Sequence, residues 1–156
     1  MAETTTRDKL LDYAKRSLRD HNGQITRLRI SELTMEFPSL SLLETIVADI
    51  RSDMPKKAEF TKVNKFDCDD YSFIFKGLVG QWYRRNRPNE LPFAIGVAWG
   101  HFHRFSPGEF HSLNFIFLAD DRKLQWIEPQ FIRESSLTDA MVKFSASRDT
   151  VSLLML

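Results

Sequence analysis

Three residues between positions 68 and 128 have the side chains that nucleophilic chemistry through a thiol requires. Cys68 is the only cysteine among the 156 residues and stands within the acidic run 67–70. At a helix start, exposed N–H groups and the positive end of the helix favour a thiolate. His111 can take up the thiol proton, and Glu128 can hold the imidazole in one tautomer. We therefore expect Cys68, His111 and Glu128 to be catalytic.

The same residues also have an ordinary structural explanation, which the sequence leaves open. Asp67 as the N-cap and Asp70 as the third residue of a helix would form a capping box, so capping alone accounts for two acids. Cys68 shares a helical stripe with Tyr71 and Phe75, where a buried thiol would be an inert apolar residue. The case for chemistry therefore depends on whether a histidine and a carboxylate reach Cys68.

The pattern of the expected strands brings such a pair together. Glu128 lies on the apolar face of an expected strand over Leu124–Glu128, and His111 lies on the apolar face of one over His111–Leu118. A carboxylate that faces a core without a partner is costly. If the loop between the strands has an even number of residues, Leu113 faces Glu128 and His111 is its diagonal neighbour.

Helices come first in this chain, and strands dominate afterwards. Apolar residues recur at helical spacing in the first half, whereas large and small residues alternate from Phe93 onward. We expect helices over Thr5–His21, Leu40–Ser52 and Cys68–Arg85, an extended piece around Ile25–Ile30, and further strands over Phe93–Trp99 and Thr150–Leu156. Helices followed by antiparallel strands predict the α+β class, with N-terminal helices followed by an antiparallel sheet.

Composition limits the remaining possibilities. We expect a single domain over 1–156, with a helical N-terminal part at 1–60 and the Cys68 helix and sheet at 61–156. Lys and Arg number 22 against 21 Asp and Glu, a net charge of +1, which gives no reason to expect a nucleic acid partner. No apolar run is long enough for a membrane span, and no secretory signal is recognisable, so we expect a cytoplasmic protein without membrane contact.

Three short segments carry a family resemblance. FDCDDYSF, HSLNFIF and WIEPQ, in this order, resemble the C-terminal domain of the fairy-ring mushroom agglutinin and its relatives, a papain-like cysteine protease domain that depends on calcium. The resemblance covers about Phe66 to Gln130. It implies a papain-like architecture and a calcium-dependent peptidase that acts on protein or peptide substrates. Cys68 would attack the carbonyl, His111 would transfer the proton, and Glu128 would orient His111.

The chain departs from this family in two respects. The named members carry a sugar-binding β-trefoil, for which 156 residues leave no room, so no lectin activity is expected. Papain also has a glutamine shortly before its nucleophile that stabilises the oxyanion. Here Asn64 or the backbone N–H of Cys68 would have to take that role.

A calcium ion would resolve an electrostatic conflict at the helix start. The aspartates beside Cys68 disfavour a thiolate by like-charge repulsion, and a bound Ca²⁺ would cancel that charge. The resemblance implies that the ligands are Asp69, Asp70, Gln130 and Asn114. Helix caps without any metal are the alternative. A zinc site at His101, His103 and His111 is a weaker one, because those histidines suit a surface loop.

Other functions remain open at this point. A catalytically silent module for oligomerisation or for assembly of a toxin or particle is one alternative. A deamidase, a transglutaminase or a cell-wall peptidase with the same three residues is another, and a homodimer is compatible with all of them. A thiol that alkylates well below pH of about 8.5, and no longer does so in His111→Ala, would favour an enzyme.

Overall fold

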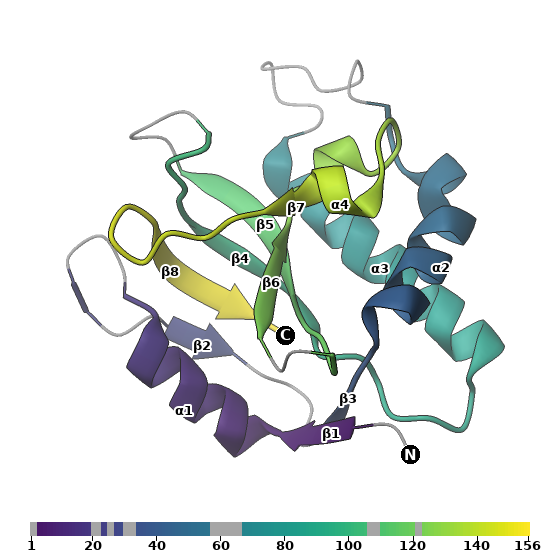
Figure 1. Cartoon of the computed structure of the whole chain (residues 1–156), viewed down its shortest axis with the longest axis horizontal. Coiled ribbons are helices and arrows are strands. Elements are labelled where there is room, and N and C mark those ends of the chain that lie inside the picture. Colours follow the sequence, from purple (N-terminus) through teal and green to yellow (C-terminus); the bar gives the residue numbers. More distant parts are fainter. Residues whose placement is uncertain are drawn as a thin grey trace.

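The fold is built on a six-stranded mixed sheet (Figure 1). The computed structural model describes residues 3–19, 23–24, 27–29, 34–56, 67–105, 110–120 and 123–156. The strand order is β2-β8-β4-β5-β6-β7. The strands span Arg27–Arg29 (β2), Thr150–Met155 (β8), Ile95–His101 (β4), His111–Phe117 (β5), Leu124–Ile127 (β6) and Met141–Val142 (β7).

Helices and a small second sheet complete the domain. A two-stranded antiparallel sheet pairs β1 (Glu3–Thr6) with β3 (Thr34–Phe37). The helices are α1 (Arg7–Ser17), α2 (Leu40–Ile50), α3 (Cys68–Asn86) and the short α4 (Leu137–Ala140), with single 3-10 turns η1 (Arg51–Asp53) and η3 (Pro129–Phe131).

The α+β class is confirmed, but two details of the expected arrangement are wrong. The large sheet is not entirely antiparallel, because β2 runs parallel to β8. The N-terminal part also contains strands, and α1 begins only at Arg7 because Thr5 and Thr6 pair with β3. The helix also ends at Ser17, earlier than the end expected at His21, since Leu18 and Arg19 are not helical. Strands of three or four residues paired across long stretches of sequence leave no local pattern to detect.

Helix α3 is the element that carries Cys68, and its sequence explains both of its ends. Asp67 caps the start in a capping box with Asp70, as expected. Arg84 and Arg85 in the last turn complement the negative end of the helix, and Pro88 follows. The buried side chains form one stripe, Tyr71, Ser72, Phe75, Val79 and Tyr83. This stripe fixes which face of α3 lies against the sheet.

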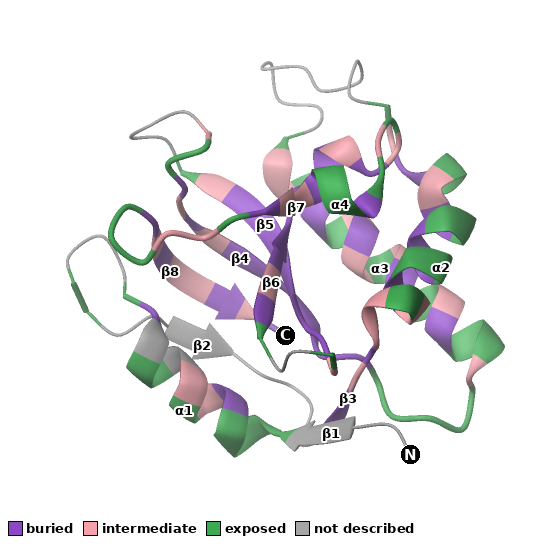
Figure 2. Ribbon diagram, viewed as in Figure 1, coloured by how far each residue is buried: buried purple, intermediate pink, exposed green. Residues whose placement is uncertain are grey.

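The sheet has a separate apolar core on each face. Strands β4 and β5, in the middle of the sheet, are mostly buried (Figure 2). On one face, α2 and α3 pack against alternate sheet residues such as Ile95, Ile116 and Ile127. On the other face, Leu10 and Leu18 from the N-terminal segment pack against the sheet residues that point the opposite way, which include Leu113, Phe115, Trp126 and Leu154. Because successive strand residues point to opposite faces, one strand supplies both cores.

Small residues let β4 lie close to its neighbours. A Cβ at Gly96 would lie 2.3 Å from the Phe115 ring, and one at Gly100 would lie 1.9 Å from the Thr150 carbonyl oxygen. Gly100 sits where the register between β4 and β8 shifts, and it pairs with His111 on the other side. The two glycines therefore allow the tight approach that places His111 at the end of the sheet.

Among the described residues, no helix combines the length and apolar character needed to cross a bilayer.

Candidate functional site

Cys68 lies at the first position of α3, half-buried and with a free thiol. The expectation that the acids on either side cap the helix is confirmed. The Asp67 side chain accepts a hydrogen bond from the Asp69 N–H (3.3 Å), and the Asp70 side chain accepts one from the Asp67 N–H (3.1 Å). The first-turn N–H groups and the positive helix end therefore act on a thiol that solvent reaches.

His111 and Glu128 form a buried pair beside this helix start. The distance from His111 Nε2 to Glu128 Oε2 is 2.5 Å, with side chains 17% and 0% exposed. The register is the one expected from sequence, because Asn114 pairs with Ile127 and Leu113 therefore faces Glu128. The other Glu128 oxygen accepts the Gln130 N–H (3.2 Å), which fixes the carboxylate at the start of η3.

His111 joins the thiol to the carboxylate, and its titration reflects both contacts. Burial disfavours the charged ring, but hydrogen bonds and attraction to Cys68 and Glu128 outweigh it and raise the pKa of His111 to about 9. The geometry thus assembles a thiol, an imidazole and a carboxylate in that order. An imidazole that stays protonated at neutral pH favours a negative charge beside it.

A polar contact between α3 and β5 sets the position of the thiol relative to the imidazole. Ser72 Oγ, one turn after the thiol, donates to the Cys68 carbonyl oxygen (3.0 Å). Ser112, the residue after His111, donates its hydroxyl to Ser72 Oγ (2.9 Å), and both serines are fully buried. The two hydroxyls therefore fix the helix start against the end of the strand.

Loop residues hold the exposed side of the imidazole. Phe105 stacks on His111 with ring centroids 4.6 Å apart and an interplanar angle of 27°. The turn that carries Phe105 is tied down by Asp149, which accepts hydrogen bonds from the backbone N–H of His103 (2.7 Å) and from that of Ser145 (2.6 Å). Asp149 therefore supports the ring that covers His111.

Exposed aromatic side chains lie near the same end of the sheet. Phe73 of α3 is 43% exposed and packs on Trp99 of β4, with centroids 5.7 Å apart. Phe110, which precedes β5, is 53% exposed and contacts the His101 ring edge to face at 4.6 Å. Large apolar side chains left in solvent beside polar groups are typical of a ligand-binding surface.

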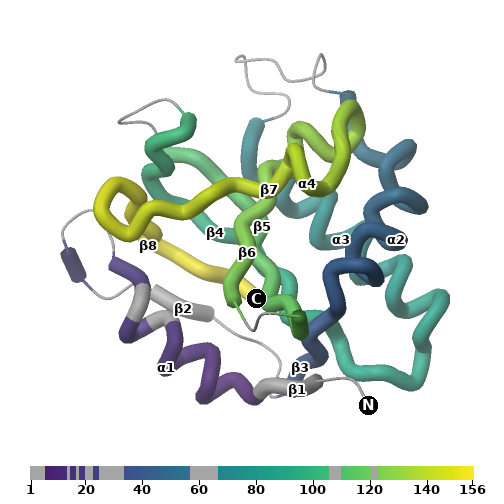
Figure 3. The backbone as a smooth tube through the Cα atoms, viewed as in Figure 1, coloured from purple at the N-terminus to yellow at the C-terminus, as the bar shows by residue number. Residues whose placement is uncertain are grey.

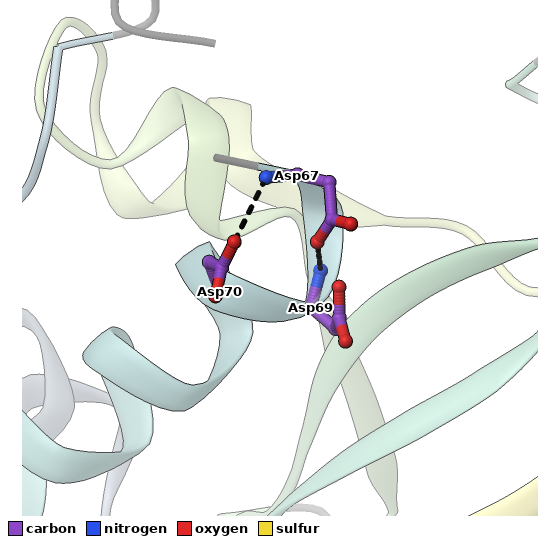
Figure 4. Close-up of side chains that lie close together, drawn as sticks. All are labelled: Asp67, Asp69 and Asp70. Carbon is purple, nitrogen blue, oxygen red and sulfur yellow. Dashed lines mark hydrogen bonds between the residues drawn. The ribbon is translucent and has the colours of Figure 1, made fainter. Parts of the chain in front are cut away.

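The acidic run gathers the carboxylates that a hard cation prefers (Figure 4). One carboxylate oxygen each from Asp67, Asp69 and Asp70 lies within 4.8 Å of the others, the only group of three possible metal ligands among the described residues. Carboxylate oxygens are the kind of ligand that Ca²⁺ prefers, but the ion takes about six to eight of them, and capping already uses an oxygen of Asp67 and one of Asp70. The group contains Asp69 and Asp70 of the predicted ligand set, with Asp67 beside them.

The structure does not place the other two predicted ligands in this group. Asn114 is fully buried under α3, where its amide donates to the carbonyl oxygens of Ser72 (2.9 Å) and Gly96 (3.1 Å). Its own oxygen has no hydrogen-bond partner among the described residues. Gln130 lies buried in η3, next to the Glu128 carboxylate. A role for either residue as a ligand stays a prediction.

The expected zinc alternative finds no support among the described residues. His103 Nδ1 contacts Asp149 (2.7 Å), His101 packs on Phe110, and His111 contacts Glu128. No group of possible metal ligands contains these histidines. Asn64, suggested for the oxyanion, lies outside the described residues.

The sequence did not point to Ser72, Ser112, Phe105 and Asp149. In the sequence, the two serines are small residues within apolar elements. Ser72 and Ser112 lie on the faces of α3 and β5 that point toward each other, and that position was a usable signal. The contribution of Asp149 depends on a contact across 46 positions of sequence, for which no local pattern exists.

Two solved structures are similar to this chain in fold. One is PSL1a in complex with E64, with a TM-score of 0.66, 19% identity, and coverage of 98% of this chain and 50% of that one. The other is Polyporus squamosus lectin bound to the human-type influenza-binding epitope Neu5Acα2-6Galβ1-4GlcNAc, with a TM-score of 0.65, 19% identity, and coverage of 98% and 49%. This chain thus spans about half the length of each. No curated protein matches the sequence.

These comparisons correct the function expected from the sequence. The prediction of a calcium-dependent cysteine peptidase, with its designation as a thiol hydrolase and its alternatives, is wrong, because the matches are to an agglutinin family and to lectins. The expectation of no lectin activity gains no support from these matches. A protein or peptide substrate and the papain-like architecture gain no support from these neighbours.

The family itself is identified by a sequence model. The model that describes the C-terminal domain of agglutinins matches residues 45–134, more than half of the chain, and this stretch includes Cys68, His111 and Glu128. The chain therefore belongs to the agglutinin C-terminal family.

Proposed function

We propose that this domain has a lectin-type function and binds a carbohydrate at the end of the sheet where α3 begins. The observation that carries the proposal is the exposure of Phe73 and Phe110 beside ionisable groups, with Trp99 packed on Phe73. Aromatic rings offer an apolar surface for the C–H face of a sugar ring. Carboxylates and imidazoles around them can bind its hydroxyl groups.

The similar structures supply the first ligand to test. Polyporus squamosus lectin was solved with a sialylated trisaccharide, and this chain corresponds to about half of that protein. The binding experiment therefore uses this chain alone. It is titrated with Neu5Acα2-6Galβ1-4GlcNAc and with the same sugar lacking sialic acid, and tryptophan fluorescence and calorimetry report the binding.

Variants locate the binding surface. Trp99→Ala and Phe73→Ala should each weaken binding by about tenfold or more if the sugar stacks there. Leu91→Ala is the matched control, because Leu91 is also a large exposed apolar residue, at 39%, but lies after α3. The proposal fails if neither sugar binds, or if all three variants bind as the wild type does.

A specific observation favours a second property of the same site, a reactive thiol. We propose that Cys68, His111 and Glu128 act as one unit, in which the imidazole takes the thiol proton and the carboxylate stabilises the charged ring. The contact of His111 with both neighbours supports this. The similar PSL1a structure is an E64 complex, which makes covalent or close binding of a small molecule near this thiol a reasonable test.

Alkylation tests the thiol directly. Iodoacetamide reacts with the thiolate, so that an S–C bond forms and iodide leaves. The rate should stay high below pH of about 8.5 and fall in His111→Ala and Glu128→Gln. Glu44→Gln, which removes an exposed carboxylate on α2, is the control. If the alkylation rate of the wild type and of every variant has the pH dependence of an ordinary thiol, Cys68 is not activated.

Calcium at the aspartate cluster is a separate proposal. Ca²⁺ bound by Asp67, Asp69 and Asp70 would neutralise charge beside Cys68 and hold the first turn of α3. Addition of Ca²⁺ should raise the melting temperature, EGTA should reverse the shift, and Asp69→Asn should abolish it. An unchanged melting temperature in Ca²⁺ and in EGTA would exclude the site. A homodimer stays a prediction for which sedimentation supplies the test.

A further inference from the structure

We propose that a pocket on the C-terminal half of α3 is a second binding site, for a small organic anion with an apolar body. The cavity has a volume of about 560 Å³, in the range of ligand sites. One wall is a face of α3, and the other is the segment that leads from α3 into β4. The lining includes Gly77, Gly80 and Arg84 of α3 and Pro92, Phe93 and Ile95 of the other wall.

The Arg84 end of this pocket lies far from the site described above, although Lys76, which also lines the pocket, is only eight positions from Cys68 in α3. Cys68 begins α3, whereas Arg84 is in its last turn. At about 1.5 Å per residue the two positions are roughly 24 Å apart along the helix axis. A ligand in the pocket would therefore leave Cys68 and His111 free, and binding at the two sites can be measured separately.

The walls of the pocket are fixed by a buried polar network. Glu36 of β3 is 2% exposed and accepts hydrogen bonds from the Tyr83 hydroxyl and from Arg87 (2.9 Å). Backbone bonds from Glu36 N–H to Pro92 (2.9 Å) and from Ala94 N–H to Glu36 (3.1 Å) tie the second wall to the same strand. The pocket is therefore preformed, which reduces the entropic cost of binding.

The charges in the pocket favour an anion. Arg87 is compensated by Glu36 and by Glu90, at 2.9 Å and 3.5 Å. Lys76 adds an ammonium group, one of whose N–H groups donates to the Ile95 carbonyl oxygen (3.1 Å). Arg84 also lines the pocket, and no carboxylate pairs with it in the part of the chain that the structure describes. A guanidinium presents a planar fork that suits a carboxylate, sulfonate or phosphate.

Two glycines in α3 give independent support. Glycine destabilises a helix interior relative to alanine, so a glycine there calls for a reason. Packing does not provide one, because a Cβ at Gly77 or at Gly80 would meet nothing within 4 Å. Both residues line the pocket, and the space that their missing side chains leave is part of it. Close approach of a ligand to the helix backbone is the use that such a surface allows.

The rest of the lining indicates what else the ligand carries. Pro88, Pro92, Phe93 and Ile95 supply apolar surface opposite the cations. A simple inorganic ion would leave this surface without a partner, whereas a neutral apolar molecule would leave the Arg84 guanidinium unused. The chemistry therefore fits one acidic group attached to a compact apolar or aromatic body.

Nuclear magnetic resonance can follow the pocket directly. The chain has six glycines, whose amide signals form a small and separate group in a ¹⁵N correlation spectrum. The probe is sodium benzoate, with benzyl alcohol as its neutral analogue and inorganic phosphate as an anion without an apolar body. We expect benzoate to shift the Gly77 and Gly80 signals in a saturable manner and to leave Gly23 unchanged. Benzyl alcohol and phosphate should shift them more weakly.

Variants separate this site from general attraction to a cationic surface. Arg84→Gln should weaken benzoate binding about tenfold, and the double change with Lys76→Gln should weaken it further. Arg85→Gln is the matched control, because Arg85 is the exposed neighbour of Arg84 and lines a different, smaller hollow beside α2. Gly80→Leu should block the pocket without disturbing the fold, since a Cβ at this position meets nothing within 4 Å.

Three results would each overturn the proposal. One is an absence of saturable shifts at Gly77 and Gly80 with benzoate at millimolar concentration. Another is equal weakening by Arg84→Gln and Arg85→Gln, which would indicate nonspecific charge attraction. Binding of benzyl alcohol as strong as that of benzoate would likewise contradict an anion site. The melting temperature of each variant, measured alongside, confirms that its fold is intact.

Discussion

At the scale of single residues, the candidate site depends on a series of side-chain contacts. The sequence predicted some of these contacts and not others. His111 and Glu128 are polar residues on apolar strand faces, and period-two alternation was enough to predict their pairing. The ligand role given to Asn114 gained no support, because alternation places Asn114 on the opposite face from His111, under α3. The serines that align helix and strand were not predicted at all.

The raised pKa of His111 predicts a pH-dependent stability. Because the pKa rises from 6.5 to about 9 on folding, the stabilisation is complete below 6.5 and is lost as the pH rises through about 9. Urea unfolding should show the advantage of the wild type over His111→Gln shrinking across this interval by up to about 3 kcal/mol. Titration of the imidazole near its ordinary pKa, followed by proton NMR, would contradict the prediction, and Glu128→Gln should lower that pKa.

The serine contact predicts a measurable coupling. Ser72→Ala leaves the buried Ser112 hydroxyl without its acceptor and should cost about 1–3 kcal/mol in the free energy of unfolding. Ser72→Ala combined with Ser112→Ala should cost less than the sum of the two single changes. The same variants should slow alkylation of Cys68 if the contact positions the thiol. Additive losses of stability would show that the hydroxyls act independently.

At the scale of elements, local patterns predicted α2, α3 and the strands from β4 to β6, all of which have their own periodicity and end signals. Elements defined by distant partners were missed or shortened, as for β1, β3 and the parallel pairing of β2 with β8. The acidic run was predicted as both a helix cap and a metal site, and the cap is confirmed. A cap is local, whereas a metal site needs distant ligands in place.

Replacement of glycine by alanine should have opposite effects on the stability of the domain in β4 and in α3. Gly100→Ala places a methyl group 1.9 Å from the Thr150 carbonyl oxygen and should destabilise the domain by about 2 kcal/mol or more. Gly77→Ala in α3 meets open space and should stabilise it by about 1 kcal/mol. Thermal and urea unfolding of the two variants provide the measurement. Similar effects in both would show that strand spacing is more adaptable than the contacts imply.

At the scale of the whole molecule, Glu36 links parts of the chain that are far apart in sequence. It joins β3 to the end of α3 through Arg87 and Tyr83, and to the start of the β4 region through backbone bonds. This contact explains why the N-terminal third belongs to the same folding unit as the family-matched region. No sequence pattern foretold it, because a glutamate in a short strand reads as a surface residue.

Removal of this charge should therefore destabilise the whole domain. Glu36→Gln leaves the partly buried Arg87 without its main counter-charge and should cost about 3 kcal/mol. Glu90→Gln is the matched control, since its side chain is 46% exposed and its pair with Arg87 is longer, at 3.5 Å, so a loss below about 1 kcal/mol is expected. Chemical unfolding measures both. Equal losses would show that Glu36 is not a structural link.

The place of β8 in the sheet has a consequence for the order in which the protein is made. β8 is the last of the six strands to leave the ribosome, yet it lies between β2 and β4 in the sheet. The yellow trace in Figure 3 runs beside β4. Until it emerges, β4 has an open edge and β2 has no partner in this sheet. Exposed strand edges invite pairing with other chains. A nascent chain that stalls before Thr150 should consequently be the form of this protein most in need of a chaperone.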